Sequence, residues 1–367
     1  MARTTAEPIA ASAPDIWRNT DVAVASARLD LGDAVPARIK LRAGIGCALA
    51  VITAMVGALP AFAQTPSWPT KPIRFISPFV SGGAIDLIVR PMQPLYEKAL
   101  GHPVIIEYRP GAGGSIGAAV VAKERPDGYT LLGTTTGPNA VAQSLFPDLP
   151  YHVVKSFSYI AAWGGFPILI AVHGQSPIKT AKDLIDTARA KPGTLTYGTS
   201  GVGSVGHLTG VLFGMESKTD LTHVGFKGAS DAQRSLMGQE ITMLVNTLGA
   251  HIAALEPKGP LRALAVTSAQ RSPSAPSVPT LRELGMPNVV ATNWFMLAGP
   301  AGIAPDIVKR LADVTYASMR EPAIRQAHDQ IGLESLGEMT PAQMTEFVAR
   351  EAERWAPVVK ASGAKPQ

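Results

Sequence analysis

The sequence predicts an α/β fold in which a mostly parallel sheet is divided between two domains. Short apolar segments typical of buried strands alternate along the chain with amphipathic segments of helical spacing, and glycine-rich turns separate them. Repeated units of strand, turn and helix place their strands parallel in a sheet. The length of 367 residues is more than one hydrophobic core usually supports, so we expect two domains.

The composition excludes several classes of protein. Hydrophobic residues make up 46% of the chain and charged residues 17%, which excludes a disordered chain and a coiled coil. The formal charge is +5, and the lysines and arginines are not clustered in the sequence, so the charge does not indicate nucleic-acid binding. It is compatible with a small anionic ligand. The single cysteine, Cys47, permits no internal disulfide. The seven histidines lack metal-ligand spacing, and we expect neither a metal nor a cofactor.

The N-terminal region contains a predicted signal peptide at residues 38–63. Basic residues in Arg38–Arg42 precede the apolar segment Ala43–Leu59, and Ala61–Ala63 offers the small residues that a signal peptidase reads. The apolar segment contains glycines and is shorter than the about 20 apolar residues that a membrane-spanning helix needs. We therefore expect secretion, with cleavage before Gln64.

Residues 1–37 precede this signal and do not have the pattern of one. They are rich in alanine, mixed in charge and without clear periodicity. We interpret them as an N-terminal extension that a true start nearer Val35 would remove.

The first strand-turn-helix unit contains a pair of glycines at a position that suits an anion. Ile73–Ser77 predicts a buried strand, and Ala84–Leu100 predicts a helix that stops at Gly101. Gly82 and Gly83 lie in the turn between them. The first amides of a helix have no partner within the helix, and the helix dipole is positive there, which favours an anion. Our hypothesis is a carboxylate-binding loop; the alternative is that the glycines only make a tight turn.

The same arrangement recurs in the next two units. Val104–Tyr108 predicts a strand, Arg109–Gly117 a glycine-rich turn and Ala118–Lys123 a helix. The third strand, Tyr129–Thr134, ends in a polar tip. Ligands bind parallel sheets at the carboxyl ends of the strands, where all three turns are expected. The candidate binding residues at the third tip are Thr134, Thr135, Thr136 and Asn139.

The middle of the chain predicts a passage into a second domain of the same kind. Phe157–Val172 is apolar but interrupted by glycines and a proline, as a segment that crosses between domains would be. A helix then runs to about Lys191, with Thr180 as its N-cap and Asp183 at its third position. The next strand is Leu195–Gly198.

Another helix start that suits an anion follows this strand. The turn Thr199–Ser204 leads into a predicted helix from Val205 to Met215, which carries His207 one turn in. Two such helix starts that face each other across a cleft would hold one ligand from both sides.

The remaining elements complete the two domains. They are a strand and turn over His223–Ala229, a helix over Ser230–Met237, a strand over Ile241–Val245 that ends at Asn246, a strand over Leu261–Ser268, a proline-rich loop over Ser272–Thr280, a return crossing over Phe295–Pro300, and helices near Pro305–Met319, Pro322–Ile331 and Pro341–Trp355.

The order and spacing of several short motifs match one family of receptors. These motifs are Pro78-Phe79-x-x-Gly82-Gly83-x-x-Asp86-x-x-x-Arg90, Arg109-Pro110-Gly111-Ala112-Gly113-Gly114-x-x-Gly117, Pro126-Asp127-Gly128-Tyr129, Gly201-x-Gly203-Ser204-x-x-His207, Lys227-Gly228-Ala229, Leu261–Thr267 and Val278-Pro279-Thr280. From about Trp68 to the C-terminal helix, the chain resembles the Bug-type solute-binding receptors of tripartite tricarboxylate transporters. No single motif is specific, but their order and spacing are.

This resemblance implies a periplasmic receptor with the type II periplasmic-binding-protein fold, in which two crossing strands join two α/β domains around a ligand cleft. The implied domains are 64–168 plus 294–367, and 169–293. We expect a monomer without catalytic activity that delivers a small carboxylated molecule to membrane transport subunits. The ligand is open among aromatic carboxylates, dicarboxylates, amino acids and nicotinamide-like molecules.

The resemblance also implies roles for individual residues. Carried over by position, the carboxylate donors are Ser81, Gly82 and Gly83 from the first domain and Thr199, Ser200, Gly203 and Ser204 from the second. Asp86 would organise its loop or hold an ordered water, because it should not approach a carboxylate. His207 would either contact the ligand or bond a backbone carbonyl.

For specificity, we favour Phe79, the Thr134–Asn139 loop, Lys227 and Asn246. Lys227 has an ordinary surface charge as its alternative role. Asn246 stands where the family usually has an aspartate. This difference leaves the identity of the ligand undetermined but does not change the fold that the resemblance implies.

A secreted serine hydrolase is the alternative function. Gly113–Gly117 fits the Gly-x-Ser-x-Gly pattern of a nucleophile elbow with Ser115 as the nucleophile. Two features oppose it. Arg109–Ala112 separates the strand from the serine, whereas in an elbow the strand leads almost directly to the nucleophile. The downstream histidines also lack the expected setting, since His207 lies in a predicted helix and His223 begins a strand.

Overall fold

The computed structural model describes residues 68–255, 257 and 259–365. Cys47, the extension at residues 1–37 and the predicted signal peptide with its cleavage site before Gln64 lie outside these residues. Within the described part of the chain, no helix is long and apolar enough to cross a membrane.

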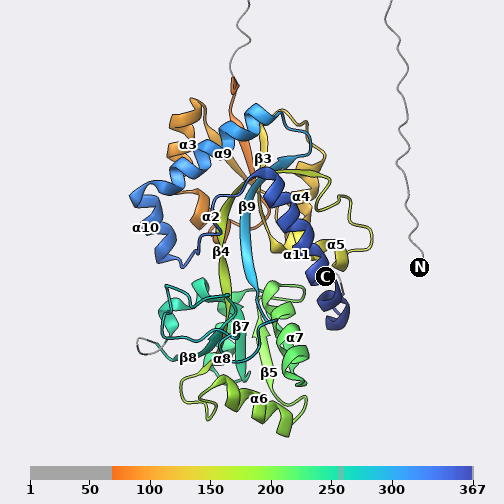
Figure 1. Ribbon diagram of the computed structural model, residues 1–367, viewed down its shortest axis with the longest axis vertical. Coiled ribbons are helices and arrows are strands. Elements are labelled where there is room, and N and C mark those ends of the chain that lie inside the picture. The colour runs from red at the N-terminus through yellow and green to blue at the C-terminus, as the bar shows by residue number, and fades with distance from the viewer. Residues whose placement is uncertain (1–67, 256, 258, 366–367) are drawn as a thin grey trace, which may run out of the picture. The chain divides into compact units, whose positions relative to one another are not determined.

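Two strands run between two α/β domains and join them (Figure 1). β4 spans Phe157–His173 and β9 spans Thr292–Pro300, and the two pair antiparallel with each other. The segment predicted to cross between the domains is therefore a strand, and the predicted return crossing lies within β9.

In the first domain, the predicted parallel units form one sheet with β9 and β4. β1 (Ile73–Ser77) lies between β2 (Val104–Tyr108) and β3 (Thr130–Thr135) and pairs parallel with both. β3 pairs antiparallel with β9. Because β1, β2 and β3 run in one direction, the loops after their carboxyl ends meet at one edge of the sheet.

The helices of the first domain are α2 (Ala84–Val89), α3 (Gln93–Leu100), α4 (Ser115–Ala122), α5 (Ala142–Leu145), α9 (Pro305–Arg320), α10 (Pro322–Gln330) and α11 (Pro341–Ser362), with the short turns η1 (Ala112–Gly114) and η2 (Gly137–Val141). The prediction of a single helix over Ala84–Leu100 is wrong, because the chain divides it into α2 and α3. Pro91 and Pro94 explain the break, since a proline inside a helix loses a hydrogen bond and clashes with the carbonyl four residues earlier.

The second domain is built on the other end of β4. There β4 pairs antiparallel with β7 (Met243–Thr247) and β8 (Leu261–Val266). β5 (Thr196–Thr199) lies parallel between β7 and β6 (Thr222–Gly225). The strand order is thus β2-β1-β3-β9-β4-β7-β5-β6, with β8 also on β4.

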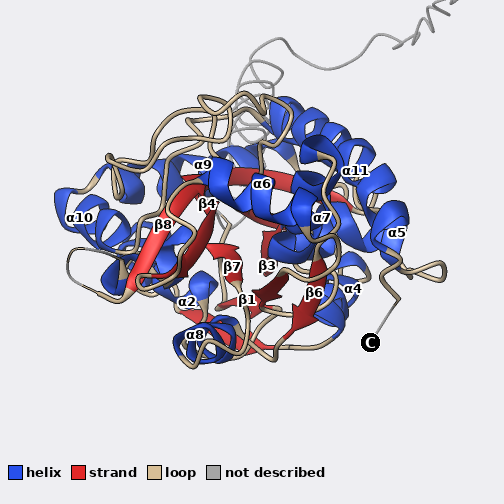
Figure 2. Cartoon of the chain, turned by 90° about the horizontal axis from the view of Figure 1, so that it is seen from below, coloured by secondary structure: helices blue, strands red, loops and turns tan. Residues whose placement is uncertain are grey.

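The helices of the second domain are α6 (Ala181–Ala190), α7 (Val205–Ser217) and α8 (Ala229–Met237), with the short turns η3 (Leu248–Ala250) and η4 (Ile252–Ala254). The predicted cap of α6 is confirmed: the Thr180 hydroxyl accepts from the Asp183 amide at 3.1 Å, and the Asp183 carboxylate accepts from the Thr180 amide at 2.9 Å. Successive residues of β7 face two different buried clusters, so both sheet faces are covered. Figure 2 shows α8 on the opposite side of these strands from α6 and α7.

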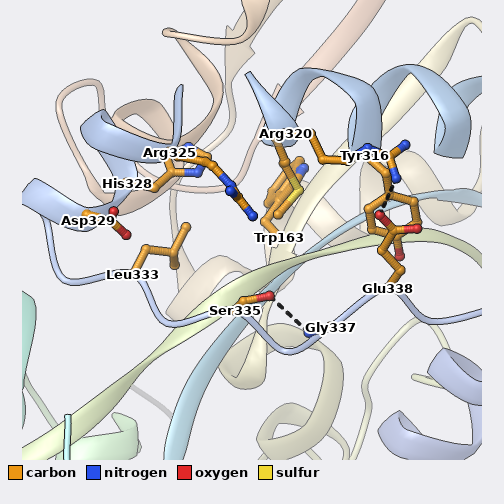
Figure 3. A pocket seen from close by; sticks show the side chains of 11 residues that line it. Trp163, Tyr316, Arg320, Arg325, His328, Asp329, Leu333, Ser335, Gly337 and Glu338 are labelled. Carbon is orange, nitrogen blue, oxygen red and sulfur yellow. Dashed lines mark hydrogen bonds and ion pairs between the residues drawn. The ribbon is translucent and has the colours of Figure 1, made fainter. Parts of the chain in front are cut away.

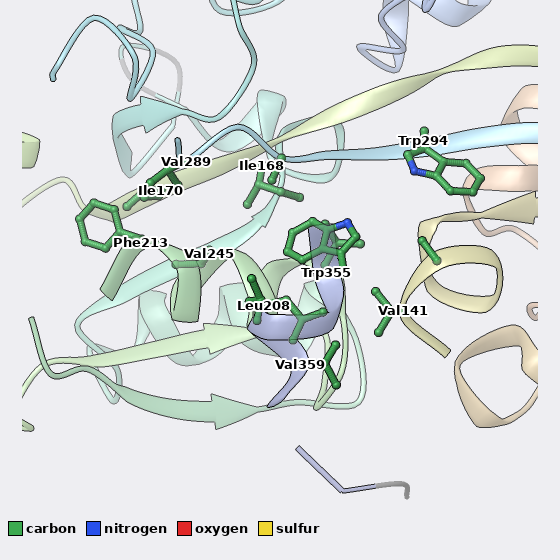
Figure 4. Close-up of a cluster of buried hydrophobic side chains, with 14 of the residues drawn as sticks. Val141, Ile168, Ile170, Leu208, Phe213, Val245, Val289, Trp294, Trp355 and Val359 are labelled. Atoms are coloured by element: carbon green, nitrogen blue, oxygen red, sulfur yellow. The ribbon is translucent and has the colours of Figure 1, made fainter. Parts of the chain in front are cut away.

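The C-terminal helix links the two domains. Trp355 of α11 is fully buried in a cluster that contains Leu208 of α7, Val245 of β7 and Ile168 of β4 (Figure 4). α11 therefore packs on the second domain as well as on the first, and it runs past the predicted end at Trp355 to Ser362. This path carries the C-terminal residues toward the space between the domains.

Candidate functional site

The space between the two domains contains a cavity of about 570 Å³. Seven of the predicted site residues line it, and both domains contribute. These residues are Phe79, Thr135, Ser200, Gly203, Ser204, Lys227 and Asn246. A cavity of this volume accommodates a small organic molecule.

The starts of three helices line this cavity. Ser115 is the first residue of α4, Ser204 is the N-cap of α7, and Gly228 is the N-cap of α8. Each helix start presents the positive end of its dipole, and the first amides of α7 and α8 have no acceptor in their own helices. At the α4 start, the amides of Ser115 and Ile116 already bond the carbonyls of Ala112 and Gly111. The site therefore favours an anion on general electrostatic grounds.

The charged side chains of the cavity have one sign. Lys227 and Lys365 line it, and no aspartate or glutamate is among the described residues that do. Lys365 follows α11 and was not expected from the sequence, because nothing local shows that the C-terminal residues reach the cleft. The two cations, like the three helix starts, favour an anionic ligand.

Two asparagines, Asn246 and Asn293, line this cavity. The Asn246 side-chain oxygen accepts from the Thr247 amide at 2.9 Å, and the Asn293 side-chain oxygen accepts from the Thr135 hydroxyl at 2.6 Å. Both amide oxygens are therefore used within the protein, and the Nδ2 donors are left for a ligand. Asn293 lies in β9 and was missed by the sequence analysis, which assigned the return crossing only from Phe295.

The glycine loop before α2 is organised by a buried carboxylate. Asp86 Oδ2 accepts from the Gly82 amide at 2.7 Å, the Tyr108 hydroxyl at 2.9 Å and the Ser81 hydroxyl at 3.2 Å. Burial raises the pKa of Asp86, but these hydrogen bonds and the nearby Arg90 guanidinium outweigh it, so the net pKa lies below its ordinary value. The carboxylate is therefore ionised when it holds the loop.

Ser81, Gly82, Gly83 and Asp86 do not line the cavity in this conformation. The Gly82 amide and the Ser81 hydroxyl are engaged by Asp86, and Gly83 is the N-cap of α2. Their assignment as carboxylate donors stays a prediction. Phe79 from the same loop does line the cavity, and its ring packs closely on Gly114, where a Cβ would lie 3.0 Å from it.

Three of the four residues predicted at the tip of β3 are buried in internal contacts. The Thr134 hydroxyl donates to Asn139, whose amino group donates to the Tyr159 hydroxyl at 2.6 Å. The Thr136 hydroxyl accepts from the Trp294 amide at 3.0 Å and so ties β3 to β9. These residues shape the wall behind the cavity, and only Thr135 lines it.

Thr199 and His207 lie behind the loop that lines the cavity. His207 Nδ1 accepts from the Gly203 amide at 3.1 Å, and the Thr199 hydroxyl lies 2.8 Å from His223 Nε2. Burial lowers the pKa of His207 to about 4, and burial together with the repulsion from a protonated His207 lowers the pKa of His223 to about 4. Both imidazoles are thus neutral at neutral pH, and they support the loop from within the second domain.

The arrangement of a hydrolase site is absent from the described residues. No hydrogen bond among them joins Ser115 to a histidine. Ser115 has φ −67° and ψ −27°, an ordinary helical conformation rather than the strained turn of a nucleophile elbow. The described residues also contain no group of histidine, cysteine, aspartate and glutamate side chains that would hold a metal ion.

A second hollow, of about 340 Å³, lies beside α9 and α10 in the first domain (Figure 3). Its charged residues have mixed signs, since Arg320 and Arg325 line it together with Asp329 and Glu338. Arg320 is paired with Glu338 at 2.6 Å. None of the predicted site residues lies there, whereas seven line the cavity between the domains, which is therefore the candidate ligand site.

The fold and the cleft define this protein as a two-domain solute-binding receptor of the periplasmic type. Residues 88–364 match the tripartite tricarboxylate transporter family receptor, and the chain belongs to this family. The resemblance drawn from its motifs is confirmed. Family and fold are those of receptors rather than enzymes.

Individual relatives agree with this assignment. The chain is 34% identical over 309 residues to Protein BugT of Bordetella pertussis, which covers 84% of this chain and 94% of that protein. It superimposes on the Rhodopseudomonas palustris protein MatC with bound malate at a TM-score of 0.70 and 28% identity, covering 80% of this chain and all of that one. A second R. palustris structure, with adipate, gives a TM-score of 0.72 and 32% identity over 82% of this chain and all of that one.

Proposed function

We propose that the cleft captures a small dicarboxylate in the periplasm and that the loaded receptor presents it to the membrane subunits of a tripartite transporter. The observation that carries this proposal is the lining of the cavity: two lysines, three helix starts and two asparagines whose amide oxygens are engaged within the protein, with no acidic side chain among the described residues that line it. Donors that converge in this way give charge-assisted hydrogen bonds to carboxylate oxygens.

The structures of relatives support the same ligand class. Malate and adipate, bound in the two R. palustris proteins, are both dicarboxylates. In this chain, Lys227 and the α7 start belong to the second domain, whereas the α4 start belongs to the first. A ligand with an anionic group at each end would contact both domains and stabilise a closed cleft, which the membrane subunits would recognise.

The remaining parts of this proposal concern the whole protein. The receptor is exported by the signal peptide at residues 38–63, is released by cleavage before Gln64, acts as a monomer and has no catalytic activity. The two domains comprise residues 64–168 plus 294–367, and residues 169–293.

Calorimetric titration of the secreted protein with malate, succinate, glutarate and adipate tests the ligand class. Each diacid is matched with its uncharged diamide, which has the same shape but no anionic group. We expect at least one diacid to bind and its diamide to fail. At 100 times its Kd, a ligand should stabilise the fold by about 2.7 kcal/mol, which thermal unfolding detects. Binding of the diamides with the affinity of the diacids, or no binding by any diacid, would overturn the proposal.

A further inference from the structure

Asn246 at the end of β7 has a buried donor without a partner. Its side chain lines the cavity and is only 3% exposed. The side-chain oxygen is held by the Thr247 amide at 2.9 Å, which fixes the orientation of the amide group. Nδ2 has no hydrogen-bond partner among the described residues. A buried donor left unpaired is unfavourable, so this atom indicates that a ligand acceptor belongs beside it.

The neighbouring helix start adds donors at the same point. Gly206 in the first turn of α7 packs directly on β7, because a Cβ there would lie 2.3 Å from the Val245 carbonyl oxygen and 3.5 Å from the Asn246 Cα. Val205 and Gly206 both line the cavity. Their amides have no acceptor in their own helix. The end of β7 and the start of α7 therefore form one concave group of donors.

An ammonium group placed at this point would meet donors and no described acidic side chain of the cavity. A carboxylate or another acceptor would be satisfied there. The same side chain with an acid in place of the amide would reverse this preference, since an aspartate presents only acceptors when ionised.

We propose that Asn246 is a ligand-binding residue that sets the specificity of the cleft: it selects an organic acid that places an acceptor against Nδ2 and rejects the corresponding acid that places an ammonium there. This inference rests on the proposed function, because it names a determinant within the same carboxylate site. It narrows the ligand class from dicarboxylates in general to dicarboxylates without an α-amino group.

The test compares pairs of ligands that differ by one ammonium group: succinate with aspartate, glutarate with glutamate, and adipate with 2-aminoadipate. Binding is measured by calorimetry with the secreted protein and its Asn246→Leu and Asn246→Asp variants. Asn246→Leu removes the donor at nearly constant shape, and Asn246→Asp replaces it with a charge. Gln326→Glu is the control, because it adds the same charge on the exposed face of α10.

We expect the unmodified protein to prefer the diacid of at least one pair. Asn246→Leu should lower the affinity for that diacid by roughly tenfold to a hundredfold, the usual effect of losing a hydrogen bond to a charged group. Asn246→Asp should lower the affinity for the diacid by roughly a hundredfold or more and shift the preference toward the amino acid of the pair. Gln326→Glu should change neither affinity.

The outcomes separate the inference from the proposed function. If the unmodified protein binds a diacid and both Asn246 variants bind it equally well, the inference fails and the proposed function stands. If the unmodified protein prefers the amino acid of each pair, the inference also fails. If none of the acids binds, the proposed function falls and the inference with it. Circular dichroism shows whether the Asn246→Asp variant folds. If that variant does not fold, the diacid affinity of Asn246→Leu tests the inference.

Discussion

The imidazole rings of His207 and His223 stack with their centroids 3.8 Å apart. His207 belongs to α7 and His223 to β6, and Tyr197 of β5 lies against both rings. Each histidine also bonds the cavity loop, at Gly203 and at Thr199 respectively. Two stacked rings in a buried site cannot both carry a proton without strong repulsion. The shape of the loop therefore depends on neutral imidazoles.

We predict that the fold loses stability in mild acid. The folded-state pKa of His207, His223 and His251 is lowered to about 4, whereas the ordinary value is 6.5. Between these values the unfolded chain binds more protons than the folded one, so stability falls as the pH falls. Each histidine contributes a slope of up to about 1.4 kcal/mol per pH unit. Urea unfolding across this range measures the slope.

His207→Asn tests whether protonation of His207 causes part of the loss of stability in acid. The asparagine oxygen lies near the position of Nδ1, so it still accepts from Gly203 but takes up no proton. We expect this variant to keep its ligand affinity at neutral pH and to show a shallower loss of stability in acid. A slope as steep as that of the unmodified protein would show that His207 is not responsible.

Gly206→Ala should damage both the fold and the site. The added methyl would lie 2.3 Å from the Val245 carbonyl oxygen, which is backbone and cannot move aside as a side chain would. We expect a loss of about 1 to 3 kcal/mol in the free energy of unfolding, because α7 must shift off β7. The shift also separates the α7 amides from Asn246, so diacid binding should weaken.

Gly238→Ala is the matched control. The added Cβ would lie 3.6 Å from the nearest atom, an ordinary contact, and the residue has a helical φ of −75°. Its stability should be unchanged or slightly raised. Equal losses in the two variants would mean that the close packing at Gly206 has no special effect.

Local patterns in the sequence predicted most of the elements. The α6 cap was predictable because Thr180 and Asp183 interact within one turn. The crossing by β4 was predictable because Phe157–Val172 is apolar but interrupted by glycines and a proline, as a segment that passes between domains would be. The break between α2 and α3 was also readable from Pro91 and Pro94, but the apolar periodicity on both sides concealed it.

The side-chain contacts of the site were less predictable, because they join residues distant in sequence. Asp86 of α2 meets Tyr108 at the end of β2, and Asn139 meets Tyr159 at the start of β4. Lys365 reaches the cleft only because α11 packs on both domains. The sequence shows which residues are polar at a strand end, but not whether they face the ligand or the core.

Asp86→Asn should loosen the glycine loop. The carboxylate accepts three hydrogen bonds, and an amide in its place gives the loop a weaker acceptor and an additional buried donor. We expect a loss of about 1 to 3 kcal/mol in the free energy of unfolding. Asp313→Asn, which removes an exposed ion pair with Lys309 on α9, should cost less than about 1 kcal/mol. Equal effects in urea unfolding would contradict the role of Asp86.

Removal of a cleft lysine should weaken diacid binding by a modest, salt-dependent factor. Lys227 and Lys365 are exposed, so water screens their charges, and each should contribute about twofold to fivefold in affinity at low salt. Lys227→Gln and Lys365→Gln remove these charges one at a time, and Lys191→Gln at the end of α6 is the control. Because long-range attraction acts chiefly on association, stopped-flow measurements should show slower binding with little change in dissociation. The difference in affinity between each variant and the unmodified protein should shrink at high salt.

Two other results would contradict this prediction. A hundredfold loss of affinity in either variant would show that its lysine forms a desolvated ion pair with the ligand. A variant with the same affinity as Lys191→Gln at every salt concentration would show that its lysine has no part in binding.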